Sequence, residues 1–314
     1  MLAVRPLKGF ALGCLTALIC LSCANQNPIE IEDVDLFSAQ GFKSTNGVSF
    51  SSDGRVIYMA LRHETEETFS IYAAHDEGGI WSGPQLISFS EKDFDPYEPT
   101  IAPDGSFLVF NSRAPWPGVD DPPVDGPRLW ATERQGDGWK EPVPLANIAN
   151  ESFASSYATF NESGDLYYFS GSTPIPSRPS GLAGDNGGYL TEAIYFAKKT
   201  GSGYGPSEFL ADLLPVSAPG QKIGVGDPWI SPKGDYIIYT IYDDAIGWRA
   251  SVDLVISFTS AEGWTPPIKL DAINSDGADN SPSGTPDEEW LYFRNSGQLR
   301  RTKLQPLLKS VKPE

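Results

Sequence analysis

Two acidic residues of this 314-residue chain have the type and spacing to perform chemistry together. Glu98 and Asp227 each stand directly before a proline that begins a short apolar run, so they occupy the same position in two copies of one pattern. A pair of carboxyl groups hydrolyses glycosidic bonds when the two lie roughly 5–9.5 Å apart and one has a raised pKa. The two residues are therefore candidate catalytic carboxylates of a glycoside hydrolase, although no glycosidase family motif accompanies them.

Polar and aromatic residues surround the same positions. Carboxylates, amides and aromatic rings together suit a sugar or another polar ligand, neutral or cationic. The alternative is that these groups satisfy strand ends and hold water near a buried axis. Arg62 and Arg113, equally spaced from their turns, could bind Glu98 or a carboxylate of a neighbouring unit. The candidate ligand-binding residues are Tyr97, Glu98, Arg113, Tyr157, Asp227, Trp229, Asn280, Arg62 and His63.

Histidine and cysteine chemistry is scarce in this sequence. His63 and His75 are the two histidines, and the three cysteines all lie within the first 23 residues. This composition leaves no His/Cys metal cluster of the usual kind, and a serine triad would have to use His63. Acidic loops at 120–125 and 274–280 offer oxygen ligands for calcium, but neither follows the twelve-residue calcium-loop pattern. We therefore expect no metal and no cofactor, with calcium as the alternative.

A five-fold internal repeat must position these residues. Each copy is a short apolar strand, a turn of the Pro-Asp-Gly type and an aromatic-rich strand. The turn glycines Gly54, Gly105, Gly164 and Gly234 are 51, 59 and 70 residues apart. Self-similarity of this kind decides the architecture before any local signal does. The copies occupy residues 48–58, 99–110, 158–169, 228–239 and, in degraded form, 282–293.

Two further strand-like segments follow each of the first four turns. One is aromatic and β-branched, as at 128–132, and the next contains a glycine, an aromatic residue and a proline, as at 138–142. Four strands in about 50–70 residues are typical of a propeller blade. The fifth unit lacks an outer strand, and a strand-like run at 29–37 precedes the first unit. The sequence therefore predicts an all-β propeller of five four-stranded blades, closed by pairing the N-terminal strand with the last blade; six blades are the alternative.

The second copy preserves a family pattern. It carries, in order, Pro99, Pro103, Asp104, Gly105, Phe110, Ser112 and Arg113. In these residues the repeat resembles the PD40 repeat, a WD40-like unit of TolB-type propellers in bacterial envelope proteins, and the resemblance covers roughly residues 40–300. It implies the propeller fold and a non-catalytic role as an envelope module. It implies no particular ligand, because one fold hosts unrelated activities.

Connection lengths differ between the two faces of the predicted ring. The turns between the first two strands and between the last two strands of a unit are short, and both leave from one face. The opposite face carries long connections, among them 113–127, 171–190 and 211–226. Long loops in compact domains are more often functional than short ones, so we expect a partner on the long-loop face. The turn residues Asp53, Asp104 and Asp287 would then belong to the scaffold.

The N-terminus has the features of an export signal. Arg5 and Lys8 precede an apolar run that is short for a membrane span. The run ends in a small residue and then Cys23, which resembles the lipobox of bacterial lipoproteins, although Cys20 stands where that family has leucine. The resemblance implies lipidation of Cys23; ordinary cleavage nearby and a transmembrane anchor are the alternatives. We expect a signal peptide at 1–23, one propeller domain at 24–314, and export to the periplasm or cell envelope with a lipid anchor.

Charge narrows the classes of partner. The formal net charge is −18, and removal of Arg5 and Lys8 with the signal brings it to −20. This charge argues against nucleic acid and anionic lipid surfaces, since both require a basic patch. We expect a monomer that contacts the membrane only through its lipid anchor. The sequence favours a non-catalytic envelope binding or interaction module with a protein or glycan partner; the alternative is a glycoside hydrolase using Glu98 and Asp227 at the channel rim.

Overall fold

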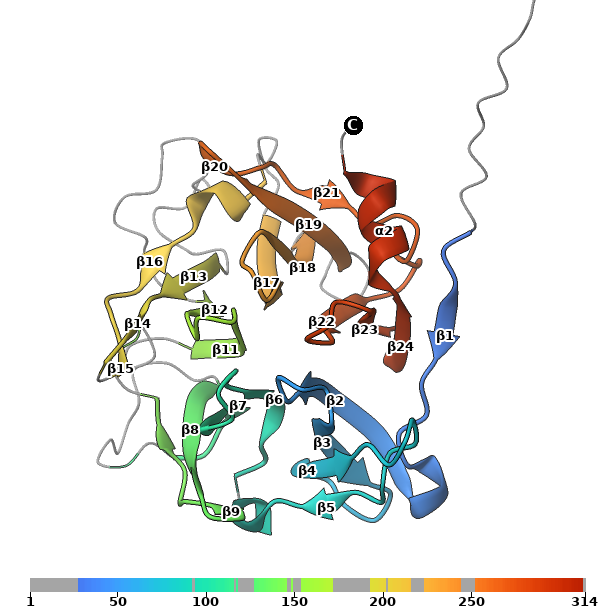
Figure 1. The fold of residues 1–314 in the computed structure, drawn as a ribbon, viewed down its shortest axis with the longest axis vertical. Coiled ribbons are helices and arrows are strands. Elements are labelled where there is room, and N and C mark those ends of the chain that lie inside the picture. Colours follow the sequence, from blue (N-terminus) through green and yellow to red (C-terminus); the bar gives the residue numbers. More distant parts are fainter. Residues whose placement is uncertain are drawn as a thin grey trace, which may run out of the picture.

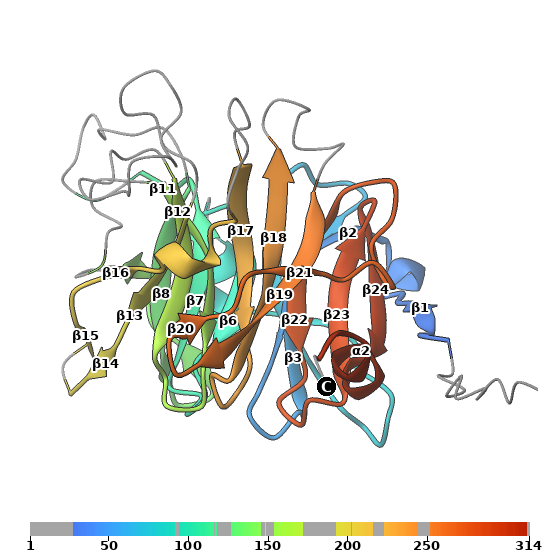
Figure 2. The ribbon, with the colours of Figure 1, turned by 90° about the horizontal axis from the view of Figure 1, so that it is seen from above.

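The structure is a computed structural model that describes residues 28–91, 94–115, 117, 127–145, 148, 154–171, 193–201, 203–215, 223–243 and 252–312. These residues form five antiparallel sheets arranged as a ring around a central axis (Figure 1). Seen from the side, the inner strands run along that axis (Figure 2). The prediction of an all-β propeller with five four-stranded blades is confirmed.

Each blade is a meander whose first strand lies nearest the axis. Blade 1 consists of β2 (Phe42–Phe50), β3 (Val56–His63), β4 (Ser70–His75) and β5 (Gln85–Leu86). Blade 2 consists of β6 (Tyr97–Ile101), β7 (Phe107–Ser112), β8 (Arg128–Gln135) and β10 (Val143–Pro144), with β9 (Gly138–Trp139) also paired to β8. Blade 3 consists of β11 (Ala154–Phe160), β12 (Leu166–Gly171), β13 (Ala193–Ala197) and β16 (Glu208–Phe209), and carries the hairpin β14 (Lys199–Thr200) and β15 (Gly203–Tyr204).

The last two blades complete the ring. Blade 4 consists of β17 (Ile223–Ile230), β18 (Tyr236–Asp243), β19 (Asp253–Ser260) and β21 (Ile268–Lys269), with β20 (Gly263–Trp264) also paired to β19. Blade 5 consists of β22 (Asp279–Gly284), β23 (Trp290–Asn295), β24 (Gln298–Lys303) and β1 (Ile31–Asp33). The short helices are η1 (Ser38–Gln40), η2 (Ser88–Glu91), η3 (Ala211–Leu213) and α2 (Leu304–Val311).

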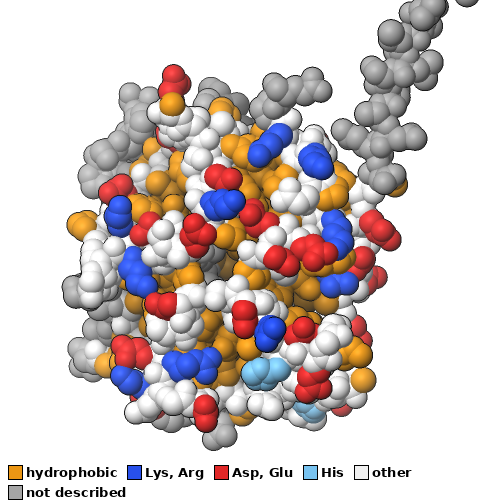
Figure 3. Space-filling model, in the orientation of Figure 1, with side chains coloured by type: hydrophobic (Ala, Val, Ile, Leu, Met, Phe, Trp, Pro, Cys, Tyr) orange, Lys and Arg blue, Asp and Glu red, His pale blue; other side chains and the backbone are white. Residues whose placement is uncertain are grey.

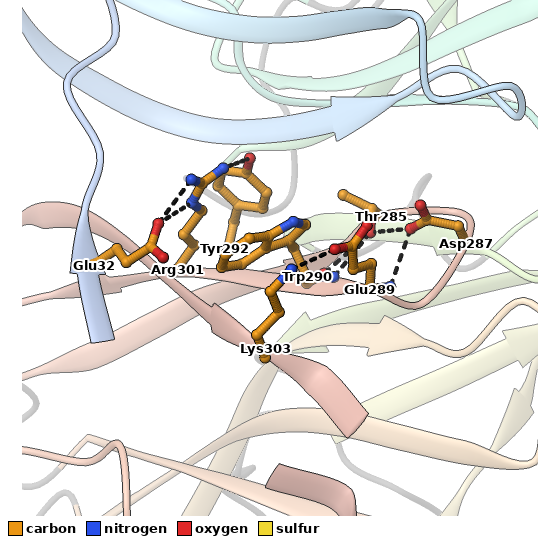
Figure 4. Close-up of polar contacts among 8 residues, drawn as sticks. All are labelled: Glu32, Thr285, Asp287, Glu289, Trp290, Tyr292, Arg301 and Lys303. Carbon is orange, nitrogen blue, oxygen red and sulfur yellow. Dashed lines mark hydrogen bonds and ion pairs between the residues drawn. The ribbon is translucent and has the colours of Figure 1, made fainter. Parts of the chain in front are cut away.

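The N-terminal strand β1 closes the ring as the outermost strand of blade 5. It pairs antiparallel with β24, with Glu32 opposite Arg301. Arg301 donates from Nε and Nη2 to the carboxylate of Glu32, each at 2.7 Å, and from Nη1 to the hydroxyl of Tyr292 at 3.3 Å (Figure 4). The same guanidinium lies 4.0 Å from the centre of the Trp290 ring, and Lys303 lies 3.7 Å from it. The predicted closure by the N-terminal strand is therefore correct.

Hydrophobic packing holds the blades together. Successive residues of a strand point to opposite faces of its sheet, so each middle strand packs against both neighbouring blades. In β3, Ile57 and Met59 pack toward blade 5, while Tyr58 packs toward blade 2. Five such clusters are described, one between each pair of adjacent blades, and Leu304, Leu307 and Leu308 of α2 join the cluster between blades 4 and 5.

The repeated turn aspartates stabilise the tight turns of the scaffold. Asp53 accepts hydrogen bonds from the hydroxyl of Ser51 at 2.6 Å and the backbone N–H of Arg55 at 3.0 Å. Asp287 accepts equivalent bonds from Thr285 and Glu289 (Figure 4). Asp104 accepts from both the side chain and the backbone of Ser106. Hydrogen bonds of this kind favour the ionised carboxylate, and they lower the pKa of Asp104 to about 2.

Candidate functional site

The inner strand of every blade contains a bulge at the same position. In each of them, three residue steps on the inner strand oppose two on its partner strand, so one residue is extra. The backbone at this bulge has positive φ in all five blades, between 45° and 83°. Glycine adopts this conformation without strain, but the other four residues do so at a cost of about 1–3 kcal/mol each. The five positions are Gly47, Glu98, Tyr157, Asp227 and Ser281.

Glu98 reaches past blade 1 to blade 5 at the level of the bulges. Its Oε1 accepts a hydrogen bond of 3.0 Å from the hydroxyl of Ser281, although blade 2 and blade 5 are not neighbours in the ring. Gly47 of blade 1 leaves the space that this side chain needs. A Cβ atom at Gly47 would lie 2.7 Å from the Cα of Glu98 and closer still to its carboxylate. Glu98 is only 8% exposed, so its carboxyl group is surrounded by three blades.

Asp227 lies beside Glu98 at the same level. Its Oδ2 accepts a hydrogen bond of 3.2 Å from the backbone N–H of Ser281. Ser281 therefore contacts both carboxyl groups, one through its hydroxyl and the other through its backbone. The second oxygen of each carboxyl group accepts no hydrogen bond within the described part of the chain.

Burial changes the protonation of both groups. Desolvation raises the pKa of Glu98 to about 8, and the nearby charge of Asp227 adds to this shift. Desolvation also raises the pKa of Asp227 to about 7, against the opposing effects of the Ser281 N–H and of Arg294. The pair therefore stays partly protonated near neutral pH.

Tyr157, Asn111 and Arg294 complete the polar surroundings of the pair. The Tyr157 hydroxyl has a pKa well above its ordinary value, first because of burial and then because of the charges of Asp227 and Glu98. Its backbone N–H donates to Asn111 Oδ1 at 3.1 Å. Arg294 lowers the pKa of both carboxyl groups without forming an ion pair with either among the described residues, and its Nη1 donates to Asn46 at 3.4 Å. Two carboxyl groups and one guanidinium are thus the charged groups at this place.

A cavity of about 280 Å³ extends from the carboxylates toward the face that carries the tight turns. Turn residues such as Ser52, Pro103 and Glu162 form its outer wall, and the carboxyl groups of Glu98 and Asp227 lie at its floor. Figure 3 shows this face, with hydrophobic atoms reaching its centre between charged side chains. The carboxylates are therefore at the floor of a channel rather than at its rim, because the bulge turns them inward.

The cavity wall mixes apolar and polar groups. Prolines follow the bulge residue in three blades and stand in the turn of three, and Phe50, Phe160 and Trp229 lie between them. Two hydroxyls of the wall are used in bonds between blades. Ser49 Oγ accepts from the backbone of Ile101 at 3.1 Å, and Thr100 Oγ1 donates to the backbone of Ala158 at 2.6 Å. Ser49 and Thr100 are therefore not free to bind a ligand, whereas Ser52, Thr159 and Ser283 also line the wall.

Three of the other predicted binding residues lie near the axis. Trp229 forms part of the cavity wall, but its ring also packs in the core between blades 4 and 5, where Gly284 has no side chain that would overlap it. Asn280 is buried and pairs in register with Arg294. Tyr97 begins β6, and burial raises its pKa to about 12. Trp229 is a wall residue with a structural role as well.

The remaining predicted residues do not contact the carboxylate pair. Arg62 lies 5.0 Å from the centre of the Phe69 ring. His63 bonds through Nδ1 to the hydroxyl of Thr65 at 2.7 Å. Arg113 is exposed, and its charge acts on Tyr97. None of the three forms a described ion pair or hydrogen bond with Glu98.

Several site residues were not predicted. Arg294 stands six residues after the turn position Glu288, and Asn111 stands six residues after Gly105. The equivalent positions in the other blades are Ala60, Ser170 and Thr240, so aligning the five copies would have shown one cation in this ring. Gly47 could have been recognised in the same alignment as the glycine member of the bulge position.

Two further predictions concern metal binding by the acidic loops and attachment to the membrane. The described residues contain no group of three or more His, Cys, Asp or Glu side chains that could hold a metal ion. Asp279 of the 274–280 loop accepts hydrogen bonds from Ser275 instead. No helix among the described residues is long and apolar enough to cross a membrane. The 120–125 loop, the segment 1–23 and Cys23 lie outside the described residues, as does much of the long-loop face, so the predictions for them stay predictions.

Comparisons with known proteins establish the fold. No family model matches the chain, and no curated protein matches it in sequence. Among solved structures, a protein of unknown function from Dyadobacter fermentans is similar, with a TM-score of 0.53 and 14% identity over 91% of this chain and 86% of that one. TolB from Acinetobacter baumannii has a TM-score of 0.49 and 14% identity over 82% of this chain, which spans only 54% of the TolB chain. A gluconolactonase from Xanthomonas campestris has a TM-score of 0.45 and 14% identity, with coverage of 83% and 72%. At these identities the likeness concerns the fold alone.

Proposed function

We propose that this propeller is a non-catalytic binding module of the cell envelope, and that its ligand occupies the central cavity. The observation that carries the proposal is a pair of buried carboxyl groups, both bonded to Ser281, at the floor of the central cavity. Buried charges without a partner are costly, and so are the strained backbone conformations that hold them. Such costs concentrate at sites where a ligand or a reaction compensates for them.

A binding role agrees with the wall of the cavity. Hydrolysis of a glycoside requires polar contacts to sugar hydroxyls and a path for water, in addition to the two carboxyl groups. Ser49 and Thr100, which could have supplied such contacts, are engaged in bonds between blades. The prolines and aromatic rings of the wall suit retention of a ligand, and Ser49 and Thr100 are not free to hold a sugar.

Glycoside hydrolysis is the second candidate, and one observation favours it. The two carboxyl groups approach the same residue from blades 2 and 4, and burial raises the pKa of both. A protonated acid beside an ionised carboxylate is the arrangement that glycosidases use.

The two candidates differ in turnover. We expect a ligand from a panel of glycans and organic amines to raise the melting temperature of the wild-type protein, because a ligand that binds only the folded state stabilises it. The E98Q/D227N variant should lose this shift, whereas Glu64→Gln, on an exposed side chain, should keep it. Chromogenic glycosides should remain intact. Hydrolysis that disappears in E98Q would assign the enzyme instead, and equal shifts in wild type and double variant would exclude the channel as the binding site.

Envelope location belongs to this proposal. It is supported by the basic and apolar N-terminal segment, by Cys23 after a small residue, and by the PD40-like repeats. We infer export and a lipid anchor at Cys23, and a partner that is a protein or a glycan-derived ligand. A contribution of the long-loop face to partner binding remains part of the proposal.

A further inference from the structure

The charges at the floor of the cavity do not balance. When both carboxyl groups are ionised, Glu98 and Asp227 supply two negative charges and Arg294 supplies one positive charge. Among the described residues Arg294 is the charge that acts on the pair. After burial, the pair in turn raises the pKa of Tyr157, and Glu98 raises that of Tyr97. Neither tyrosine carries a positive charge. One negative charge therefore remains without compensation, and the empty site is neutral only when the pair holds one proton.

Two carboxyl oxygens are available to a ligand. Glu98 uses Oε1 and Asp227 uses Oδ2 to bind Ser281, so Oε2 and Oδ1 have no hydrogen-bond donor among the described residues. Both side chains are more than nine-tenths buried, with exposed fractions of 8% and 6%. Both also line the cavity. A ligand that supplies hydrogen-bond donors and one positive charge would satisfy both oxygens and neutralise the site.

The wall above the floor selects the rest of the ligand. It carries prolines and the rings of Phe50, Phe160 and Trp229 alongside polar side chains, and the cavity volume of about 280 Å³ is enough for one small molecule. Aliphatic chains pack well on such surfaces while a terminal charge reaches a polar partner. Aromatic rings also attract cations that pass over them. The groups required are an aliphatic chain and a cationic end with several N–H donors.

We propose that the central cavity binds a primary ammonium or guanidinium group carried on an aliphatic chain, held between Glu98 and Asp227. The inference rests on the proposed function, because it takes the cavity as the ligand site and adds the chemistry of the ligand. The cation replaces the proton that neutralises the empty pair. Binding near neutral pH therefore releases about one proton, and the affinity rises with pH while the amine itself stays charged.

The first test uses n-pentylamine and n-butylguanidine as probes and 1-pentanol as the uncharged control, in calorimetric titrations at about 0.15 M salt, where weak surface binding is screened. We expect both cations to bind and the alcohol not to bind. E98Q and D227N should each weaken binding at least about tenfold, while E64Q should stay within about twofold. Equal binding of amine and alcohol, or unchanged affinity in E98Q, would overturn the proposal.

A second measurement requires no variant. Titration of the wild-type protein with n-pentylamine in two buffers of different ionisation enthalpy gives the number of protons released. We expect about one proton at pH 7, and an affinity at least about tenfold higher at pH 8 than at pH 6. Release of no proton, with an affinity independent of pH, contradicts the proposal even if the variants fail to fold.

Further probes distinguish a protein side chain from a small molecule as the source of the cation. They also distinguish failure of this inference from failure of the proposed function. A blocked tripeptide with a central lysine, compared with the same peptide carrying norleucine, tests whether a protein side chain enters the cavity; binding of the free amine alone assigns a small molecule. A neutral glycan that binds wild type and is lost in E98Q would retain the cavity as the ligand site and reject the cation. If no ligand depends on Glu98 or Asp227, both this inference and the proposed function fail.

Discussion

The fold requires a left-handed backbone at the bulge positions of Glu98 and Asp227, but it does not require a side chain there. The same bulge is formed by glycine in blade 1, so the left-handed backbone of the two acidic residues is an avoidable strain. Both are also buried, which adds the cost of desolvating a carboxyl group. Backbone strain and burial at Glu98 and Asp227 therefore lower the stability of the folded protein. We propose that binding of a ligand at these residues compensates for this loss.

The raised pKa values predict a particular dependence of stability on pH. Between about pH 5 and 7 the unfolded chain has released both protons, while the folded protein retains most of them, so the free energy of unfolding falls as pH rises. Each carboxyl group contributes up to about 1.4 kcal/mol per pH unit. Urea unfolding of wild type and of E98Q/D227N from pH 5 to 8 measures this difference. E64Q should follow the wild type; parallel curves for wild type and the double variant would contradict the pKa shifts.

Gly47 is predicted to be intolerant of a side chain because Glu98 occupies the space. Gly47→Ala combines a positive φ of 83° with an overlap on the backbone and carboxylate of Glu98. We expect a loss of about 3–4 kcal/mol in the free energy of unfolding. Gly78→Ala is a matched control, since its φ is 82° but a Cβ atom there meets nothing within 4 Å. The control should cost about 1–2 kcal/mol. Equal losses in the two variants would show that the overlap has no effect.

At the scale of the element, each inner strand serves as scaffold and as site. Residues after the bulge pack between blades, while the bulge residue faces the axis. The tight turn that follows is fixed by an aspartate in three blades. The repeated part of each unit thus builds the scaffold, and the chemistry varies at one position of it.

The contacts that hold the closing strand β1 against β24 can be tested directly. Arg301→Ala removes the contacts to Glu32, to the Tyr292 hydroxyl and to the Trp290 ring at once. Because the pair is partly exposed, we expect a loss of about 1–2 kcal/mol, measured by thermal unfolding, with faster proteolysis of the N-terminal strand. Arg300→Ala, next to it in β24, removes a single surface ion pair with Asp33 at 3.1 Å and should cost at most about 0.5 kcal/mol. An Arg301→Ala effect no larger than this control would show that the cluster does not hold β1.

At the scale of the whole molecule, the ring has two different faces. The described cavity opens on the face of the tight turns, where the hydrophobic centre is visible (Figure 3). The long connections leave from the other face, and most of them lie outside the described residues. A ligand site on one face and a partner surface on the other are compatible in a propeller, because the ring presents both at once.

The N-terminal segment predicts where the molecule is held. Cys23→Ser should prevent lipidation and shift the protein from the membrane fraction to the soluble fraction of fractionated cells. Metabolic labelling with a fatty acid should mark the wild type alone. Unchanged membrane association of the variant, without label in the wild type, would point to ordinary cleavage or a transmembrane anchor. Ser22→Ala, which keeps a small residue before the cysteine, is the control and should remain in the membrane fraction.

The sequence by itself determined the propeller, its five blades and the closing strand, because each is encoded locally: turn residues at regular spacing, apolar strands between them and an unpaired run at the N-terminus. It also marked Glu98 and Asp227 as equivalent positions. Only the tertiary structure decided that Glu98 reaches past blade 1 to Ser281, which is 183 residues away, that Gly47 makes room for it, and that Arg294 lies near the pair. These contacts depend on the closed ring, which sets distances between blades that no spacing within a unit can fix. The pKa values depend on burial in the same way, so the chemistry of the site exists only once the ring is closed.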